Sequence, residues 1–181
     1  CKRNTETDWG MNDFKNIAGI YFLGIGGIGM SALARYFRAG GFDVAGYDRT
    51  ESHLTEELVE EGCDITYTDD LSSLGSLYND PSLNDRVLVI YTPAIPAESV
   101  LLNFFRDNGY TIKKRSQVLG MISNESDTVA IAGTHGKTTV STMTAHLLTS
   151  SHVGCSAFLG GISRNYNTNL LIGTSRLAVM E

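Results

Sequence analysis

Short apolar runs alternate along the chain with segments in which apolar residues recur at helical spacing. A buried strand is predicted at Ile20–Ile25, and further strands at Phe42–Tyr47, Asp64–Tyr67, Val87–Tyr91, Tyr110–Ile112 and Thr128–Ala132, with shorter ones around Ala157–Leu159 and Leu177–Met180. Helices are predicted at Ile28–Ala39, Ser52–Glu61, Ala97–Asp107 and Gln117–Ile122. Strands that alternate with helices are typical of βαβ units, so the pattern predicts an α/β fold with a parallel sheet.

Two of the predicted helices carry a well-defined apolar face. The helix at Ala97–Asp107 is expected to bury Val100, Leu101, Phe104 and Phe105. A longer helix is predicted after residue 136, with Val140, Met143, Leu147 and Leu148 on one face. Side chains at this spacing meet on one side of a helix, which is the side that packs on a sheet.

One uncharged stretch, Ile17–Ala34, has the minimum length of a membrane span at 18 residues. Five of its positions are glycine, and each glycine inside a helix costs about 1 kcal/mol relative to alanine. A small-residue transmembrane helix is the alternative, but a strand, a glycine turn and a helix fit the glycines better. We therefore expect no membrane association.

A polar segment, Ser123–Asp127, separates two parts of different composition and marks an expected domain boundary. We expect a Rossmann-like parallel-sheet domain over residues 11–125, with residues 1–10 as an extension before Met11. Residues 126–181 are too few for a complete α/β domain. They are therefore expected to form only the start of a second, P-loop ATPase-type α/β domain.

Composition narrows the class of protein. The formal charge of −6, from 14 basic and 20 acidic residues, gives no electrostatic footprint for nucleic acid. The three cysteines, Cys1, Cys63 and Cys155, are odd in number and far apart, so neither a disulfide framework nor a zinc motif is indicated. A reducing, cytoplasmic location is the simpler expectation.

The first candidate site is a G-x-G-x-x-G pattern that follows a predicted strand and begins a helix. Its glycines, at positions 24, 26, 27 and 29, permit a tight turn and let a phosphate approach the backbone N–H groups of the helix N-terminus closely. Asp48 ends the second predicted strand, where an acid can bind ribose hydroxyls. The pattern predicts a nucleotide diphosphate site; a merely tight βα turn is the alternative.

The second candidate site is Gly133-Thr134-His135-Gly136-Lys137-Thr138-Thr139, between a strand and a helix. It is similar to a P-loop, in which N–H groups hold phosphates, the lysine neutralises β and γ oxygens, and the threonine hydroxyl reaches Mg²⁺. It is shorter than the usual pattern, because Ile131 stands where the first glycine would be. The alternative is a helix N-terminus with an incidental lysine and threonine.

The two loops, in this order, resemble those of the Mur ligases, the ATP-dependent amide-forming enzymes of peptidoglycan synthesis. Further matching pieces are Met30 and Ser31 after the first loop, Gly46-Tyr47-Asp48 with Ser52 and Thr55, Thr92-Pro93-Ala94-Ile95, Lys114-Arg115-Ser116, and Gly160-Gly161. The resemblance extends from Asn12 to Glu181, and it also accounts for the shortened second loop.

The resemblance implies UDP-N-acetylmuramate and L-alanine as substrates and Mg²⁺ and ATP as cofactors. It implies an acyl phosphate, formed from the lactyl carboxylate and the γ-phosphate, which the amine then displaces. The ATP loop would be residues 133–139, with Lys137 and Glu181 catalytic and with Thr138 and Glu181 holding the metal. The implied substrate-binding residues are Gly24, Gly26, Gly27, Gly29, Met30, Ser31, Asp48, Ser52, Thr92, Pro93, Arg115, Asn165 and Asn167.

Other functions stay open at this point. An NAD-dependent oxidoreductase would use the first loop and Asp48 but leaves the second loop without a role. A non-catalytic nucleotide-binding module and the related ligase that recycles murein tripeptide are further alternatives, and Asn165 and Asn167 can equally be loop-capping residues. The resemblance implies a third domain beyond residue 181, so the chain on its own is expected to form no amide. The oligomeric state is not predicted.

Overall fold

The computed structural model describes residues 12–181. The expected extension over residues 1–10, Met11 and Cys1 lie outside the described residues. No helix within the described part of the chain is both long enough and apolar enough to cross a membrane.

The first sheet has five parallel strands in the order β3-β2-β1-β4-β5. The strands are β1 (Gly19–Leu23), β2 (Asp43–Tyr47), β3 (Asp64–Thr66), β4 (Val87–Tyr91) and β5 (Thr111–Lys114). All residues of β1 are buried, which explains why the strand is a continuous apolar run rather than an alternating one. The predicted parallel α/β fold is confirmed.

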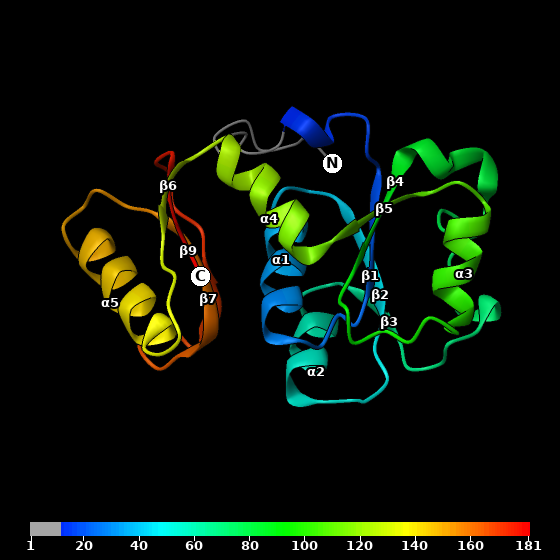
Figure 1. The fold of residues 1–181 in the computed structure, drawn as a ribbon, viewed down its shortest axis with the longest axis horizontal. Helices are drawn as coiled ribbons and strands as arrows, with labels where there is room; N and C mark the ends of the chain where they lie inside the picture. Colours follow the sequence, from blue (N-terminus) through cyan, green and yellow to red (C-terminus); the bar gives the residue numbers. More distant parts are fainter. Residues whose placement is uncertain (1–11) are drawn as a thin grey trace.

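Helices cover both faces of this sheet (Figure 1). The helices α1 (Ile28–Ala39), α2 (His53–Glu60) and α4 (Arg115–Asn124) lie on one face, and α3 (Val100–Asp107) lies on the other. Three short 3₁₀ turns complete this part, at Asn12–Phe14, Leu71–Ser73 and Pro81–Arg86. Ser52 caps α2 by accepting a hydrogen bond from the Thr55 amide, as the serine before an apolar run suggests.

The expected burial of Val100 is wrong, because this side chain is 47% exposed. Val100 lies in the first turn of α3, where its amide and that of Leu101 donate to the carboxylate of Asp69. Asp69 therefore fixes the start of the helix so that Leu101 and Phe105 face the sheet and Val100 faces solvent.

The second sheet has four strands in the order β6-β9-β7-β8. They are β6 (Asp127–Ala130), β7 (Ser156–Ser163), β8 (Thr168–Leu171) and β9 (Leu177–Met180), and α5 (Lys137–Ser150) packs on the side away from the first sheet (Figure 1). The sequence pattern did not predict β8, which is antiparallel to β7 across an irregular register. The domain boundary between residues 125 and 126 stays a prediction; β6 begins at Asp127.

The apolar face expected on α5 is largely exposed in the described chain. Val140, Met143 and Leu147 are 48%, 61% and 67% exposed, whereas Ser141 and Ala145 are fully buried against the sheet. Small side chains let the helix approach the sheet closely. The helix therefore packs chiefly by its small residues, with Leu148 partly buried against the same core, and presents Val140, Met143 and Leu147 outward.

Helix α1 lies between the two sheets and is buried against both (Figure 1). Every residue from Met30 to Phe37 is buried, so no face of these two turns meets solvent. Phe37 packs toward the first sheet with Phe22, while Tyr36 contacts Phe158 of β7 at a ring-centroid distance of 5.2 Å. One apolar core therefore extends from β1 through α1 to β7, β8 and β9.

Gly120 is exposed in the middle of α4, and a Cβ there would meet no atom within 4 Å. We expect Gly120→Ala to raise the free energy of unfolding by about 0.5–1 kcal/mol, because alanine loses less backbone entropy in a helix. Urea denaturation measures this. Gly154→Ala is the matched control: it has equal space but a φ of +70°, and it should destabilise. A loss of stability in Gly120→Ala would contradict the expectation.

Candidate functional site

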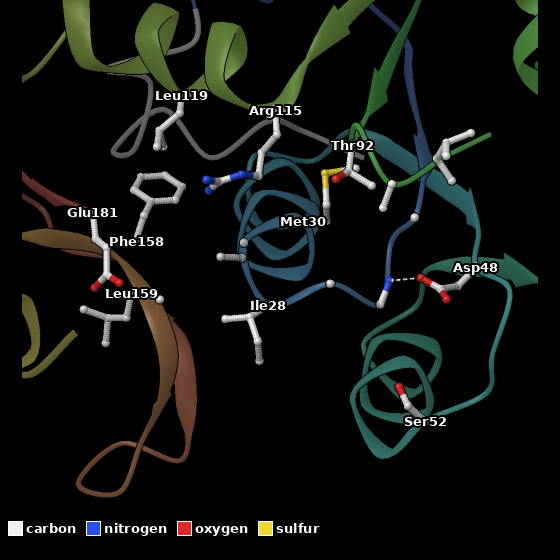
Figure 2. Close-up of a pocket in the computed structure, with 18 of the residues that line it drawn as sticks. Ile28, Met30, Asp48, Ser52, Thr92, Arg115, Leu119, Phe158, Leu159 and Glu181 are labelled. Carbon is white, nitrogen blue, oxygen red and sulfur yellow. Dashed lines mark hydrogen bonds between the residues drawn. The ribbon is translucent and has the colours of Figure 1, made fainter. Parts of the chain in front are cut away.

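A cavity of about 800 Å³ lies between the first sheet and the second, and both predicted loops contribute to it (Figure 2). It begins at the carboxyl ends of β1 and β4, the neighbouring strands at which the strand order reverses. Ligands of open α/β sheets bind at this position, because the loops after the two strands diverge there. Its far wall is formed by Phe158, Leu159 and Gly160 of β7, with Lys137 and Glu181.

The first loop requires glycine at its start for a conformational and a steric reason. Gly24 has a φ of +90°, which glycine adopts without strain. A Cβ there would lie 2.6 Å from Cγ2 of Thr92, the residue that follows β4. The two strand ends therefore meet closely, and α1 begins four residues later with its N-terminus at the cavity.

Asp48 holds the shape of this loop. Its Oδ2 accepts a hydrogen bond of 2.7 Å from the Gly26 amide (Figure 2). Its Oδ1 accepts one of 3.2 Å from the Thr50 amide. A Cβ at Gly26 would lie 2.9 Å from both Asp48 Oδ2 and Thr55 Cγ2. The expected reason for glycine, close approach of a phosphate, is thus incomplete, because the neighbouring side chains already exclude a larger residue.

Arg115 and Arg49 both bring positive charge to the cavity on this side, and Arg115 lies nearer the glycine loop's helix. It is the first residue of α4, and its side chain extends toward the space between Met30 and Phe158 (Figure 2). A Cβ at Gly29 would lie only 2.5 Å from Arg115 Nη1, so the guanidinium lies directly over the first turn of α1. Within the described residues it forms no ion pair. A guanidinium beside a helix N-terminus is suited to an anion.

The second loop has the backbone geometry of a tight strand-to-helix turn. Gly133 and Gly136 have φ values of +150° and +78°, and α5 begins at Lys137. The Lys137 ammonium lies 2.9 Å from the Gly133 carbonyl and donates to it, so the side chain folds back over the loop. Lys137 lines the cavity, whereas Thr134 and His135 are exposed outside it.

Glu181 follows β9 and its carboxylate lies against α5. Thr138 Oγ1 donates to Oε1 at 2.7 Å, and Ser141 Oγ donates to Oε2 at 2.8 Å. The structure therefore brings together Thr138 and Glu181, the expected metal ligands. Sequence reasoning missed Ser141, a fully buried serine on a helix with apolar neighbours. The available signal was its position, one helical turn after Thr138.

The predicted site residues divide by where they lie. Those that line the cavity are Gly24, Gly26, Gly27, Gly29, Met30, Asp48, Ser52, Thr92, Arg115, Lys137 and Glu181. Those that do not are Ser31, Pro93, Gly133, Thr134, His135, Gly136, Thr138, Thr139, Asn165 and Asn167. Thr138, Thr139 and Asn165 line a second, shallower hollow of about 290 Å³ beside α5. Asn167 is in a turn with a φ of +51°.

Ser31 departs furthest from its expected role, because it is fully buried below the loop. Its hydroxyl donates to the Ile28 carbonyl at 2.9 Å and accepts from Asn169 at 2.8 Å. Leu119 and Phe158 line the cavity without having been singled out in the sequence. They are ordinary apolar residues, which no local pattern distinguishes from core residues.

The fold and the two loops define a class of protein. Residues 19–126 match the model described as Mur ligase family, catalytic domain, and the chain belongs to this family.

Three proteins of known name are similar to the chain in sequence or in structure. The chain is 55% identical, over 163 residues, to UDP-N-acetylmuramate–L-alanine ligase from Phocaeicola vulgatus, covering 90% of this chain and 35% of that protein. It is similar to the crystal structure of UDP-N-acetylmuramate–alanine ligase from Thermotoga maritima, with 29% identity, a TM-score of 0.78, and coverage of 90% of this chain and 36% of that one.

The third relative is a Neisseria ligase named for UDP-N-acetylmuramate and a tripeptide, L-alanyl-γ-D-glutamyl-meso-diaminopimelate. It shares the fold at 22% identity with a TM-score of 0.79, covering 91% of this chain and 52% of that one. The chain thus spans about a third of the length of the curated relatives it matches.

Proposed function

We propose that this chain is the part of an ATP-dependent ligase that binds UDP-N-acetylmuramate and the phosphates of ATP, in an enzyme that joins L-alanine to the lactyl carboxylate. One observation carries the proposal. The glycine loop of the first sheet and Lys137 and Glu181 of the second line a single cavity. A reaction between a nucleotide-linked acid and ATP needs both compounds in one such space.

The end of the cavity next to the first sheet suits a nucleotide diphosphate. The N-terminus of α1 presents backbone N–H groups, and Arg115 adds a full positive charge beside them. Both oxygens of Asp48 already accept backbone N–H groups. This arrangement favours a role for Asp48 in stabilising the loop. In an NAD site the same carboxylate would instead bind the ribose hydroxyls.

The opposite end suits Mg²⁺ and a triphosphate. Thr138 and Glu181 supply a hydroxyl and a carboxylate oxygen, which are ligands that Mg²⁺ accepts. The described residues contain no group of three or more His, Cys, Asp or Glu that could hold a metal. Further oxygens would therefore come from the nucleotide and water. Bound Mg²⁺ would neutralise charge on the transferring phosphoryl group.

In the proposed reaction the lactyl carboxylate attacks the γ-phosphorus of ATP as the bond to ADP breaks. The amine of L-alanine then attacks the acyl carbon and inorganic phosphate leaves. Lys137, released from the Gly133 carbonyl, would hold the γ-phosphate oxygens. Arg115 and the α1 N-terminus would orient the nucleotide sugar so that its carboxylate faces that phosphate. We propose a cytoplasmic location and a domain boundary between residues 125 and 126.

Calorimetry on the 181-residue chain tests the binding half of this proposal. We expect UDP-N-acetylmuramate to bind more tightly than NADH, and Arg115→Ala to weaken the nucleotide sugar about tenfold through loss of a charged contact. Lys114→Ala is the control, because Lys114 is exposed and does not line the cavity. Tighter binding of NADH would contradict the proposal.

A chimera tests the catalytic half. In this chimeric ligase the chain replaces the matching 163-residue stretch of the Phocaeicola vulgatus enzyme, to which it is 55% identical. We expect amide formation from UDP-N-acetylmuramate, L-alanine and Mg²⁺-ATP by the chimeric ligase and none by the 181-residue chain alone. A well-folded chimera without activity would reject the assignment.

A further inference from the structure

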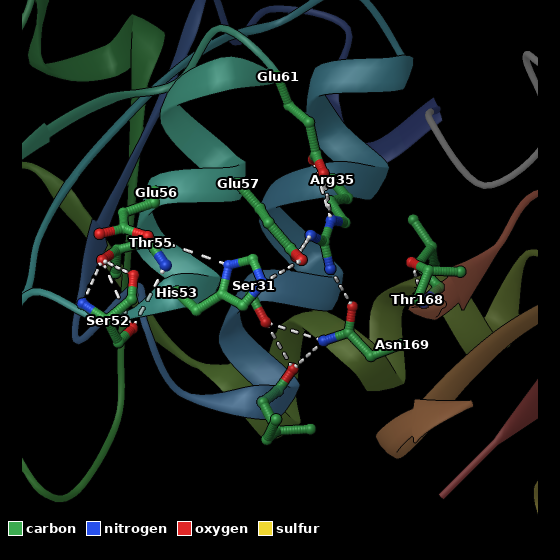
Figure 3. A network of polar contacts seen from close by, with 12 residues as sticks. Ser31, Arg35, Ser52, His53, Thr55, Glu56, Glu57, Glu61, Thr168 and Asn169 are labelled. Carbon is green, nitrogen blue, oxygen red and sulfur yellow. Dashed lines mark hydrogen bonds and ion pairs between the residues drawn. The ribbon is translucent and has the colours of Figure 1, made fainter. Parts of the chain in front are cut away.

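A network of polar groups, whose members on α1 and β8 are buried, joins the two sheets below the cavity (Figure 3). It consists of Ser31 and Arg35 of α1, Glu57 of α2, Glu61 at the end of α2, and Asn169 of β8. Ser31 and Arg35 are four residues apart, so they lie on the same face of α1. None of the five residues lines the cavity.

Asn169 is the centre of this network. It is fully buried, and its Oδ1 accepts a hydrogen bond of 2.6 Å from Arg35 Nη1. Its Nδ2 donates to the Ile28 carbonyl at 2.6 Å and to Ser31 Oγ at 2.8 Å (Figure 3). Both ends of the carboxamide are therefore bound to α1, although Asn169 belongs to the second sheet.

Arg35 connects Asn169 to α2. It is 9% exposed; its Nη2 lies 2.6 Å from Glu57 Oε2, and its Nε lies 2.9 Å from Glu61 Oε1. A buried charge is costly unless it is paired and its remaining hydrogen-bonding groups are satisfied. Since Asn169 accepts from Nη1, that nitrogen keeps this partner only when β8 lies in one place against α1.

The network differs in kind from the apolar contact around it. Tyr36 and Phe158 also hold the sheets together, but apolar contacts are non-directional and tolerate small rotations. Hydrogen bonds weaken steeply away from their preferred distance and angle. The Asn169 bonds therefore define the orientation that the apolar core alone leaves loosely specified.

That orientation bears directly on the cavity. Ile28 and Ser31 form the first turn of α1, immediately after the glycine loop. β8 pairs with β7, and β7 pairs with β9, the strand that ends before Glu181. Asn169 thus connects the two walls of the cavity from behind.

We propose that Asn169 is a positioning residue that fixes the glycine loop relative to the wall carrying Lys137 and Glu181. The proposal extends the proposed function. It rests on that function only in the affinity measurement, which uses UDP-N-acetylmuramate as the probe. Loss of the Asn169 carboxamide leaves the fold intact, widens the range of relative orientations of the two sheets, and weakens a ligand that must contact both walls.

Two measurements on the 181-residue chain test this. The first is the distance distribution between spin labels at Asp107→Cys and Ser150→Cys, exposed positions on α3 and α5, in a Cys1→Ser background. Cys63 and Cys155 are buried, and burial raises the pKa of both thiols, to about 11 for Cys63, so labelling favours the introduced sites. The second is the affinity for UDP-N-acetylmuramate by calorimetry.

Asn169→Ala is expected to broaden the distance distribution and to weaken the affinity about tenfold. Asn169→Asp, which keeps an acceptor for Arg35 but loses the donor toward Ile28 and Ser31, should show the same two effects. Asn84→Ala is the matched control, because it removes a carboxamide that donates to the Asn108 carbonyl away from the cavity. It should lower stability while leaving distance and affinity unchanged.

Unchanged distances and affinity in folded Asn169→Ala would overturn the proposal. If that variant does not fold, Ser31→Ala decides the question, because it removes a single partner of Asn169; an unchanged distance distribution there would equally overturn it. Failure of the wild-type chain to bind the nucleotide sugar would count against the proposed function instead. The distance measurement would still decide the role of Asn169, since it needs no ligand.

Discussion

Replacing Lys137 by alanine in the chimeric ligase is expected to lower the rate of amide formation by about a thousandfold. The Lys137 ammonium lies over the second loop, where it donates to the Gly133 carbonyl and can turn to a phosphate. Charge that develops on the transferring phosphoryl group is stabilised chiefly by fixed positive groups, so removing one affects the transition state most. A coupled phosphate-release assay measures the rate.

Binding of UDP-N-acetylmuramate should change little in the same variant. Lys137 is proposed to hold the γ-phosphate of ATP rather than the nucleotide sugar, so calorimetry should give an affinity for the nucleotide sugar within about threefold of wild type. The expected boundary between residues 125 and 126 would place the two loops in separate domains. Because the glycine loop and Lys137 line one cavity, any separation of the two effects depends on the distance between them within that cavity. Turnover of ATP near the wild-type rate would refute the P-loop assignment.

Gly160→Ala should impair the enzyme by a different route. A Cβ at Gly160 would overlap the Glu181 carboxylate and lie 3.0 Å from Thr138 Oγ1. Since the carboxylate is the end of a flexible side chain, we expect it to move and the free energy of unfolding to change by less than about 1 kcal/mol. The proposed metal ligands would then be displaced, raising the Mg²⁺ concentration needed for half-maximal rate about tenfold or more.

The Mg²⁺ dependence of amide formation by the chimeric ligase tests this second expectation. Gly120→Ala is the control, because it makes the same chemical change on α4, where a Cβ meets nothing. Urea denaturation of the 181-residue chain with Gly160→Ala separates a local effect from unfolding. A Mg²⁺ dependence identical to wild type would show that Glu181 does not hold the metal.

The features that the sequence predicted well depend on local patterns. β1, the glycine loop and α1 follow one another within about twenty residues, and glycine spacing with helical periodicity is enough to find them. The same holds for the second loop and the start of α5. Arg115 was singled out only by the resemblance, and the fold places it, and not the neighbouring Lys114, at the cavity.

The features that sequence reasoning missed depend on contacts between distant segments. Asn169 lies 134 residues from Arg35 and 138 from Ser31. It belongs to a polar segment that pairs antiparallel with β7, and no hydrophobic periodicity in the sequence predicts this pairing. Asn165 and Asn167 attracted attention by their closeness to Gly160-Gly161, whereas the asparagine that is fully buried is two residues further on. The exposure of Val140, Met143 and Leu147 on α5 could not be predicted for a related reason. The helix packs on the sheet through Ser141 and Ala145, whose small side chains allow a closer approach.

Helix α1 also limits how this family can vary. Because the residues from Met30 to Phe37 are buried on all sides between two sheets, the helix has no face on which substitutions could accumulate freely. A larger side chain at Tyr36 would have to be matched by a smaller one at Phe158, across a sequence separation that includes the second loop. The half that carries the glycine loop and the half that carries the second loop are thus not interchangeable modules. Either half could be exchanged for that of a distant relative only if α1 and its partners on β7 and β8 were exchanged with it.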